Sequence, residues 1–299
     1  MLISKHHPLF LIMIATCSVA LGQNKLLDSA FNSFHQGNYS KAVDLYKQVV
    51  AKDHYDFEML LLGLCYEKMD SIPQAKQLFE QTIEHKSTFK DAACDASREL
   101  ADLYYKEKNY RKAIDYYRKN GEIWEHARFA DVNKFAFEFQ KAVNISNCFK
   151  SLGEIDSAIA QPLPYIFSNF LMLKGYVFRF GPEKSDLPDS LHCDSVCRSY
   201  LMLLKERYTV RRIKRELKKA DANFEFKERN HLFGKDSIYV ERTAQIGFAF
   251  LGVPIKRDGF GVLLNQGEAT PTKYGRYFTR EYYLTQFRQM PLYKMIEAL

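Results

Sequence analysis

Residues 34–46 read FHQGNYSKAVDLY, and the spacing inside this stretch decides the fold of the first half of the chain. A Gly-Asn-Tyr turn signal leads into an alanine, Ala42, and an aromatic residue, Tyr46, follows four positions later. A similar order of small and aromatic residues returns around Ala75 and Ala113. Self-similarity at a regular period is typical of arrays that repeat one supersecondary unit, so we expect stacked units in this region.

The period of these units is close to that of a helical hairpin. Ala42, Ala75, Ala113 and a looser match at Ala158 are separated by 33, 38 and 45 residues. An alanine methyl group lets two crossing helices approach closely, and an aromatic side chain four residues later lies on the same helical face. Because a single hairpin cannot bury its apolar face, we expect the hairpins to stack into a curved, right-handed array with a concave side.

The first three units resemble the tetratricopeptide family, whose repeat is a helical hairpin of 34 residues. The matching residues are Leu62-Gly63 and Tyr66 in the first helix, residues 37–39 in the turn, and Ala42 with Tyr46 in the second helix. The resemblance covers about residues 24–160 and implies a mostly α fold, a solenoid of hairpins that binds other proteins or peptides.

The resemblance weakens at several places: the family's linking proline is missing after each second helix, and an extended connection over residues 86–91 precedes the third repeat. Asp70 stands where the second repeat should have a turn glycine. Pro162 and Pro164 stand where the second helix of a fourth repeat should run, and proline inside a helix breaks it. We therefore expect three clear repeats and a degenerate fourth within a repeat domain that spans residues 23–170.

In the tetratricopeptide family, the first helix of each hairpin lines the concave groove. Carried over to this chain, the lining comprises three groups of residues, one for each clear repeat: Leu27, Phe31, Phe34 and His35; Phe57, Leu60, Leu64, Glu67 and Lys68; and Asp95, Arg98, Asp102, Tyr105 and Lys106. An alternative holds for Leu27, Phe31, Leu60 and Leu64, which could instead pack against the N-terminal flank.

Residues 1–22 have the features of a secretory signal peptide. Lys5 precedes an apolar run over residues 8–20, and small residues follow, so we expect cleavage before Gln23 and export to the periplasm or cell envelope. Residues 14–17 also resemble a lipobox, which makes a lipoprotein anchored at Cys17 an alternative; another is a buried N-terminal helix. No later segment is apolar enough to predict a membrane span.

Cleavage would leave five cysteines, Cys65, Cys94, Cys148, Cys193 and Cys197. The first three fall within expected helices and are predicted to be buried thiols. Cys193 and Cys197 could close a local disulfide, provided that the segment between them is not regular helix. His192 beside Cys193 suggests a metal cluster, but a fourth ligand at a recognisable spacing is lacking, so we expect no metal and no other cofactor.

Residues 171–230 are expected to form a loop followed by a long helix from about residue 189 to residue 220. Within this helix, residues 205–219 carry eight basic and two acidic side chains. Such a basic amphipathic helix could bind an anionic surface, or it could simply present a solvated face. Nucleic acid is not an expected partner, because export separates the protein from it.

Residues 231–299 are predicted to form a small α+β module. Short β-like runs occur at residues 237–240, 246–251 and 261–264, with turn signals at residues 258–259 and 265–267. Helix is expected again over residues 282–298, interrupted at Pro291.

The chain lacks the sequence motifs of a phosphate-binding loop, a nucleophile elbow and a zinc protease. We therefore interpret the protein as a non-catalytic scaffold or adaptor that binds a protein or peptide in the cell envelope. The alternative is an enzyme whose active site lies in residues 231–299, with the repeats as its targeting arm.

Overall fold

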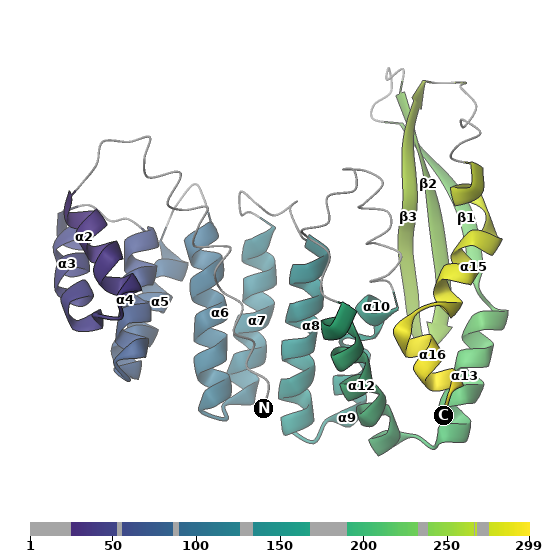
Figure 1. Cartoon of the computed structure of the whole chain (residues 1–299), viewed down its shortest axis with the longest axis horizontal. Helices are drawn as coiled ribbons and strands as arrows, with labels where there is room; N and C mark the ends of the chain where they lie inside the picture. The colour runs from purple at the N-terminus through teal and green to yellow at the C-terminus, as the bar shows by residue number, and fades with distance from the viewer. Residues whose placement is uncertain are drawn as a thin grey trace. The chain divides into compact units, whose positions relative to one another are not determined.

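The computed structural model describes residues 25–52, 56–85, 90–125, 134–167, 190–232, 239–265, 267 and 275–299 (Figure 1). The predicted signal peptide, the cleavage site and Cys17 lie outside this range, as does most of the loop expected before residue 189. Within it, no helix combines the length and the apolar character that a membrane crossing requires. The chain divides into two compact units, Met1–Val132 and Asn133–Leu299, which we describe separately.

The described residues of the N-terminal unit form three consecutive helical hairpins, as the repeat pattern predicts (Figure 1). The hairpins pair α2 (Lys25–His35) with α3 (Tyr39–Lys52), α4 (Asp56–Lys68) with α5 (Ile72–Glu84), and α6 (Asp91–Lys106) with α7 (Tyr110–Trp124). The helices also pack from one hairpin to the next, α3 on α4 and α5 on α6.

The residues that define the repeat form the core of this unit. Ala42, Ala75 and Ala113 are each 0% exposed, which places the small side chains at the tightest positions. The aromatic residues four positions later are also buried. At Gly63 a Cβ atom would come within 2.6 Å of the Phe79 ring, so glycine is required for α4 to approach α5 this closely.

Each hairpin turns through one residue with positive φ. This residue is Gly37 in the first hairpin, Asp70 in the second and Lys108 in the third, with φ of 75°, 58° and 62°. The next backbone N–H then donates to a carbonyl five residues earlier, for example from Asn109 to Tyr104 at 2.9 Å. Asp70 thus takes the conformation that glycine would favour, and the turn survives the substitution.

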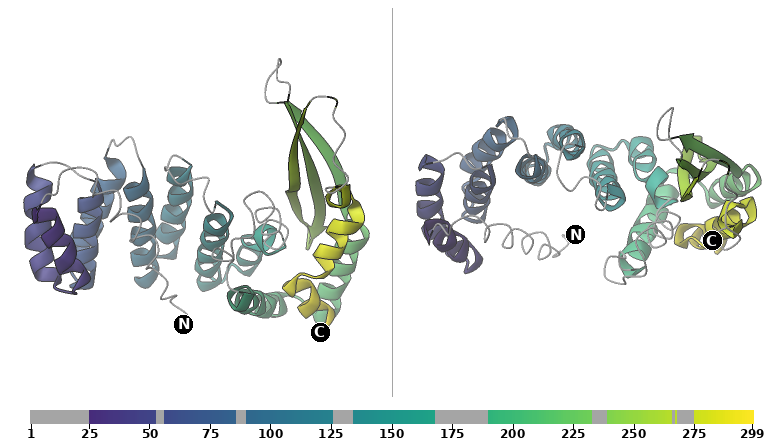
Figure 2. Two further views of the ribbon diagram at one scale, coloured as in Figure 1. Left: turned by 45° about the horizontal axis from the view of Figure 1, so that its top comes forward. Right: turned by 90° about the horizontal axis from the view of Figure 1, so that it is seen from above.

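Where the structure describes it, the C-terminal unit combines helices with one antiparallel sheet. The helices in these residues are α8 (Lys134–Ser151), α9 (Ile155–Ala160), α10 (Leu163–Ile166), α12 (Ser190–Arg207), α13 (Val210–Ala222), η2 (Arg276–Phe278), α15 (Arg280–Arg288) and α16 (Pro291–Glu297). The strands are β1 (Glu225–Leu232), β2 (Tyr239–Phe250) and β3 (Val253–Asn265), in the order β1-β2-β3. α13 packs on β2 and α15 on β1, and Figure 2 shows α13, α15 and α16 gathered beside the sheet.

Aromatic side chains fill the core between the sheet and the helices. Phe248 of β2 lies 4.6 Å from Phe287 of α15 and 5.5 Å from Phe167, between ring centroids. Phe224, just before β1, stacks on Phe248 at 5.8 Å. These contacts join segments that are far apart in sequence, and they hold the α+β module together.

The single long helix predicted near residues 189–220 is wrong. Two helices, α12 and α13, occupy this region, and Thr209 separates them. Its backbone is extended, with ψ of 148°, and its hydroxyl accepts a hydrogen bond from the Arg212 N–H at 3.3 Å. A threonine N-cap therefore starts a new helix inside a pattern that is continuous in apolar residues.

The turn expected at residues 258–259 is also wrong, because both residues lie within β3. The connection between β2 and β3 is instead Leu251-Gly252, where both φ angles are positive, 51° and 80°. The pairing register shifts between Thr243 and Gln245, where residues 259 and 260 of β3 lie opposite the single residue 244 of β2, so the turn signal falls at a β-bulge. The predicted helix over residues 282–298 is present as α15 and α16, and Pro291 begins the second of them.

Candidate functional site

The candidate groove residues lie on the first helices of the three hairpins, α2, α4 and α6. Of these helices, α4 and α6 lie side by side. The fourteen side chains differ in exposure: His35, Lys68 and Lys106 are exposed, Leu60 is buried, and the others are half-buried. The structure separates them into an apolar group and a polar group.

The apolar group belongs largely to the packing of the first two hairpins. Five of its members contact the core cluster formed by α2, α3 and α4: Leu27, Phe31, Phe34, Phe57 and Leu64. Leu60 is only 3% exposed, so it does not offer a binding surface. The reason is that α4 packs against α3, α5 and α6, which buries it on several sides, and its central residues 59–66 are correspondingly apolar on every face.

The polar group forms a network between α4 and α6. Lys106 of α6 donates to Glu67 of α4 at 2.6 Å. About two turns earlier on α6, Arg98 lies 2.8 Å from Glu99 and 3.4 Å from Asp95 of the same helix. We define the α4–α6 network as Glu67, Asp95, Arg98, Glu99, Asp102 and Lys106.

The helical spacing explains why these side chains meet. Arg98, Asp102 and Lys106 follow one another at intervals of four residues, so they lie along one stripe of α6. Sequence reasoning missed Glu99, although its place directly beside Arg98 and four residues after Asp95 could have indicated it. Lys68 is exposed outside this network, and Tyr105 packs edge-to-face on Tyr110 at 5.4 Å.

Burial and neighbouring charges shift the acid–base properties of the network. Burial raises the pKa of Asp102, although the hydroxyl of Tyr117 donates to its carboxylate and partly opposes this. For Lys106, burial lowers the pKa, but the hydrogen bond and the charge of Glu67 outweigh it and the pKa is raised. Lys106 therefore stays charged beside the carboxylates of the network, and such a charged group suits the recognition of polar or charged groups.

Further polar contacts fix how α6 sits against its neighbours. Asn120 of α7 donates to the Cys94 carbonyl oxygen at 2.6 Å, and the Ser97 hydroxyl donates to the Tyr116 carbonyl oxygen at 3.0 Å. On the other side, Lys76 of α5 pairs with Glu107. Side chains on both adjacent helices therefore hold the α6 stripe in place before any partner binds.

Four cysteine side chains lie in the part of the chain that the structure describes. Cys65, Cys94, Cys148 and Cys197 are buried thiols, as expected for the first three. The local disulfide considered for Cys193 and Cys197 required a segment that is not regular helix, but both residues lie within the α-helix α12. Burial raises the pKa of Cys65 and Cys94 to about 12, so neither is a thiolate at neutral pH.

In the part of the chain that the structure describes, no group of three or more His, Cys, Asp or Glu residues could hold a metal ion. The side chains of His192 and Cys193, the suggested metal cluster, lie outside the described residues.

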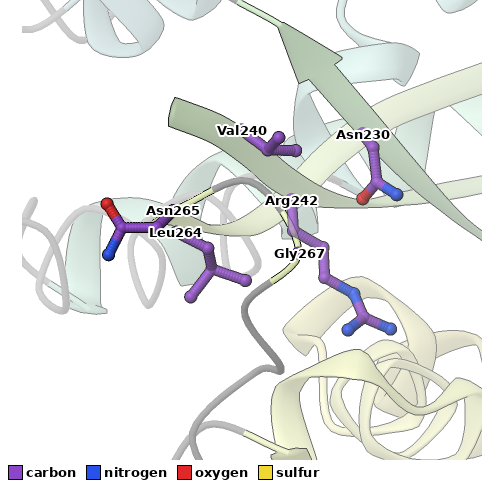
Figure 3. Close-up of a pocket in the computed structure, with 6 residues that line it drawn as sticks. All are labelled: Asn230, Val240, Arg242, Leu264, Asn265 and Gly267. Atoms are coloured by element: carbon purple, nitrogen blue, oxygen red, sulfur yellow. The ribbon is translucent and has the colours of Figure 1, made fainter. Parts of the chain in front are cut away.

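A hollow of about 220 Å³ opens at one end of the sheet (Figure 3). It is lined by Asn230, Val240, Arg242, Leu264, Asn265 and Gly267. Arg242 is already paired with Glu228 and lies 5.2 Å over the Phe278 ring. The six described residues that line the hollow include neither a nucleophile nor a general base.

Comparison with known proteins supports the repeat assignment. Residues 59–85, which span most of α4 and all of α5, match a model of the tetratricopeptide repeat. This hairpin is therefore a tetratricopeptide repeat, and it lies within three consecutive helical hairpins. No curated protein matches the chain.

Among solved structures, MamA AMB-1 shares 21% identity at a TM-score of 0.38, and the match covers 61% of this chain and 80% of MamA. A Podosopora anserina putative kinesin light chain with nearly identical TPR-like repeats shares 15% identity at a TM-score of 0.42. That match covers 61% of this chain and 87% of the other.

Proposed function

We propose that this protein is an exported, non-catalytic scaffold that binds a protein or peptide partner through the first helices of its hairpins. The observation that carries the proposal is the α4–α6 network, a set of charged side chains held along two adjacent first helices of tetratricopeptide-type hairpins. Tetratricopeptide repeats are protein-interaction modules, and their arrays bind through extended surfaces of this kind.

The network is suited to recognition because it is partly accessible and already ordered. The side chains of Lys106 and Arg98 are 56% and 36% exposed, while Glu67, which anchors Lys106, is 11% exposed. A partner that adds hydrogen bonds to these groups gains about 1.5–3 kcal/mol for each charged hydrogen bond. It also avoids much of the entropy cost of ordering long side chains, because the protein has ordered them in advance.

The proposed location follows from the N-terminal sequence. Lys5, the apolar run of residues 8–20 and the small residues before Gln23 support export to the cell envelope. N-terminal sequencing and mass spectrometry of the mature protein test this step. We expect a chain that begins at Gln23, whereas a diacylglycerol on Cys17 would favour the lipoprotein alternative and an intact Met1 would contradict both.

A pair of charge-swap variants tests the binding surface. Glu67→Lys combined with Lys106→Glu keeps the ion pair between α4 and α6 but reverses the charges offered to a partner. The matched control is Asp115→Lys combined with Arg118→Glu, which swaps two exposed charges on α7, a second helix.

Both variants and the unaltered protein are used to capture partners from envelope extract, with quantitative mass spectrometry as the readout. We expect a set of proteins that the unaltered chain and the α7 control recover and that the α4–α6 variant loses. Equal recovery by all three would contradict binding through the first helices.

A further inference from the structure

A second surface, on the C-terminal unit, carries a different kind of charge. Helix α13 has six basic and two acidic residues among its thirteen. Its apolar residues Ile213, Leu217 and Ala220 are buried, and the helix packs on β2 and α16. This packing fixes which face of α13 points outward.

The outward face is a row of cations, which we call the basic crest and define as Arg211, Arg212, Arg215, Lys218 and Lys219. All five are exposed. Arg211, Arg215 and Lys218 follow at spacings of four and three residues, so they line up along the helix opposite the buried stripe. At 1.5 Å per residue this row is about 10 Å long.

The acidic residues of α13 neutralise the crest only in part. Asp221 is engaged away from it, because both carboxylate oxygens accept hydrogen bonds from Arg288 of α15 at 2.7 Å. Glu216 is shared between Lys219 at 3.0 Å and Arg215 at 3.6 Å. Even so, the side chains of Arg215 and Lys219 remain 63% and 58% exposed.

The crest also lies on the unit that carries the net charge of the molecule. Residues 133–299 contain 26 basic and 18 acidic side chains, a net charge of +8, whereas residues 23–132 have a net charge of −2. The two ends of the chain therefore differ in their electrostatic preference, and the C-terminal unit attracts anions over a range of about one Debye length, ~8–10 Å.

From this geometry we infer that the basic crest docks on the surface of an anionic phospholipid membrane. A row of long, exposed cationic side chains fits an extended surface of negative charge, since each side chain has only to come near the headgroups. A bound peptide would instead need a groove or an open strand edge. The described hollow of this unit is lined by strand residues and the segment after β3, and no residue of α13 contributes to it.

The same packing predicts how the docking takes place. Helices that insert into a membrane interface bury their apolar face among the lipid chains. In α13 that face is already used against β2 and α16, so the helix lies on the headgroups without inserting. The attraction is then electrostatic, salt-sensitive and indifferent to the identity of the cation.

Vesicle binding tests the inference with the chain that begins at Gln23, which keeps every residue the structure describes. We compare vesicles of phosphatidylcholine with vesicles in which about one third of the lipid is phosphatidylglycerol, at low and high salt. We expect binding to the anionic vesicles at low salt, little binding to the neutral ones, and release at high salt.

Three variants identify the surface. Arg211→Gln, Arg215→Gln and Lys218→Gln together should weaken binding on the order of 100-fold, since each basic residue near an anionic surface contributes a factor of about five. The matched control, Lys25→Gln, Lys41→Gln and Arg118→Gln, removes the same charge from exposed sites on the other unit and should bind like the unaltered chain. Arg211→Lys with Arg215→Lys should also bind normally, because it conserves charge.

Several results would overturn the inference. One is equal weakening by the crest variant and its control, which would mean that only net charge matters. Another is equal binding to neutral and anionic vesicles. A third is binding to soluble polyglutamate without binding to anionic vesicles, which would identify an acidic protein as the partner. Circular dichroism and thermal unfolding of each variant establish that the fold is kept.

Discussion

The third hairpin, α6–α7, and the fourth, α8–α9, make the same turn but end differently. In each turn a residue with positive φ, Lys108 or Gly153, precedes an N–H that donates five residues back at 2.9 Å. Yet α7 runs for 15 residues, whereas α9 stops after six, just before Pro162. The turn depends on a few local backbone contacts, while the length of the second helix depends on where the next proline falls.

Because α9 is short, another helix, α12, makes the contacts at its end. The Ile159 carbonyl lies in the last turn of α9, where carbonyls lack a partner within the helix. The buried hydroxyl of Tyr200, from α12, donates to this oxygen at 2.8 Å. Around it, Arg207 pairs with Asp156 at 2.7 Å and Lys150 with Glu206 at 2.9 Å. Helix α12 thus supplies what a full-length second helix would have supplied itself.

The largest effects on the free energy of unfolding are expected at the helix crossings, where the two helices of a hairpin pack most closely. Ala113 and Ala158 are both 0% exposed, at the helix crossings of the third and fourth hairpins. Ala113→Leu should overpack its crossing and cost about 3 kcal/mol, the upper part of the usual range. Ala158→Leu should cost less, since the short α9 can shift more easily. Urea unfolding of both variants measures this, and equal midpoints for Ala113→Leu and the unaltered chain would contradict the repeat packing.

A smaller effect is expected where α12 completes the fourth hairpin. Tyr200→Phe leaves the Ile159 carbonyl buried without its donor, which should lower the free energy of unfolding by about 2 kcal/mol. Tyr208→Phe is the control, because its hydroxyl contacts the exposed Asp156 at 3.2 Å, and it should change stability by less than about 0.5 kcal/mol. If both variants unfold alike, α12 does not serve the hairpin in this way.

The part of the fold that could be predicted from the sequence is the part that depends on local spacing. The alanine and aromatic spacings that define the three hairpins are local, so the sequence shows them directly. Strand β1 was missed because EFKERNHL is mostly polar, with four charged residues among its eight, and Phe226 is its one half-buried apolar residue among those described. The break at Thr209 was missed because the apolar pattern runs on across it.

The candidate site was less predictable than the fold. Position within a repeat correctly indicated which residues lie on the first helices, but it could not show that α4 is enclosed by three helices and that Leu60 is therefore buried. The network was predictable only in part, because the pairing of Glu67 with Lys106 joins residues 39 positions apart. Such pairing depends on how α4 and α6 are stacked.

Substitutions at the left-handed residues of the third and fourth turns should each change the free energy of unfolding by about 1 kcal/mol. Lys108 has φ of 62°, a left-handed conformation that costs an L-residue roughly 1–2 kcal/mol, so Lys108→Gly should stabilise the third hairpin by up to about 1 kcal/mol. Gly153→Ala should destabilise the fourth hairpin by a similar amount. Its φ of 78° is the only source of this cost, because a Cβ atom at residue 153 would meet nothing within 4 Å and so would not clash. Opposite signs in thermal unfolding are expected, and equal signs would show that the two turns are not equivalent.

The smallest effect concerns a contact that distinguishes the third hairpin, the hydrogen bond from Tyr117 to Asp102. Burial raises the pKa of Asp102 in the folded protein, so the folded state holds its proton to a higher pH than the unfolded state does. This group therefore favours folding below its unfolded pKa, and that contribution is lost as pH rises through the folded pKa. Asp102→Asn keeps an oxygen that accepts from Tyr117 but removes the buried charge. It should raise stability at neutral pH by less than about 1 kcal/mol and flatten the decline of stability between acidic and neutral pH. Urea unfolding across this range measures the slope, and a steeper decline in the variant would mean that the charged carboxylate stabilises α6.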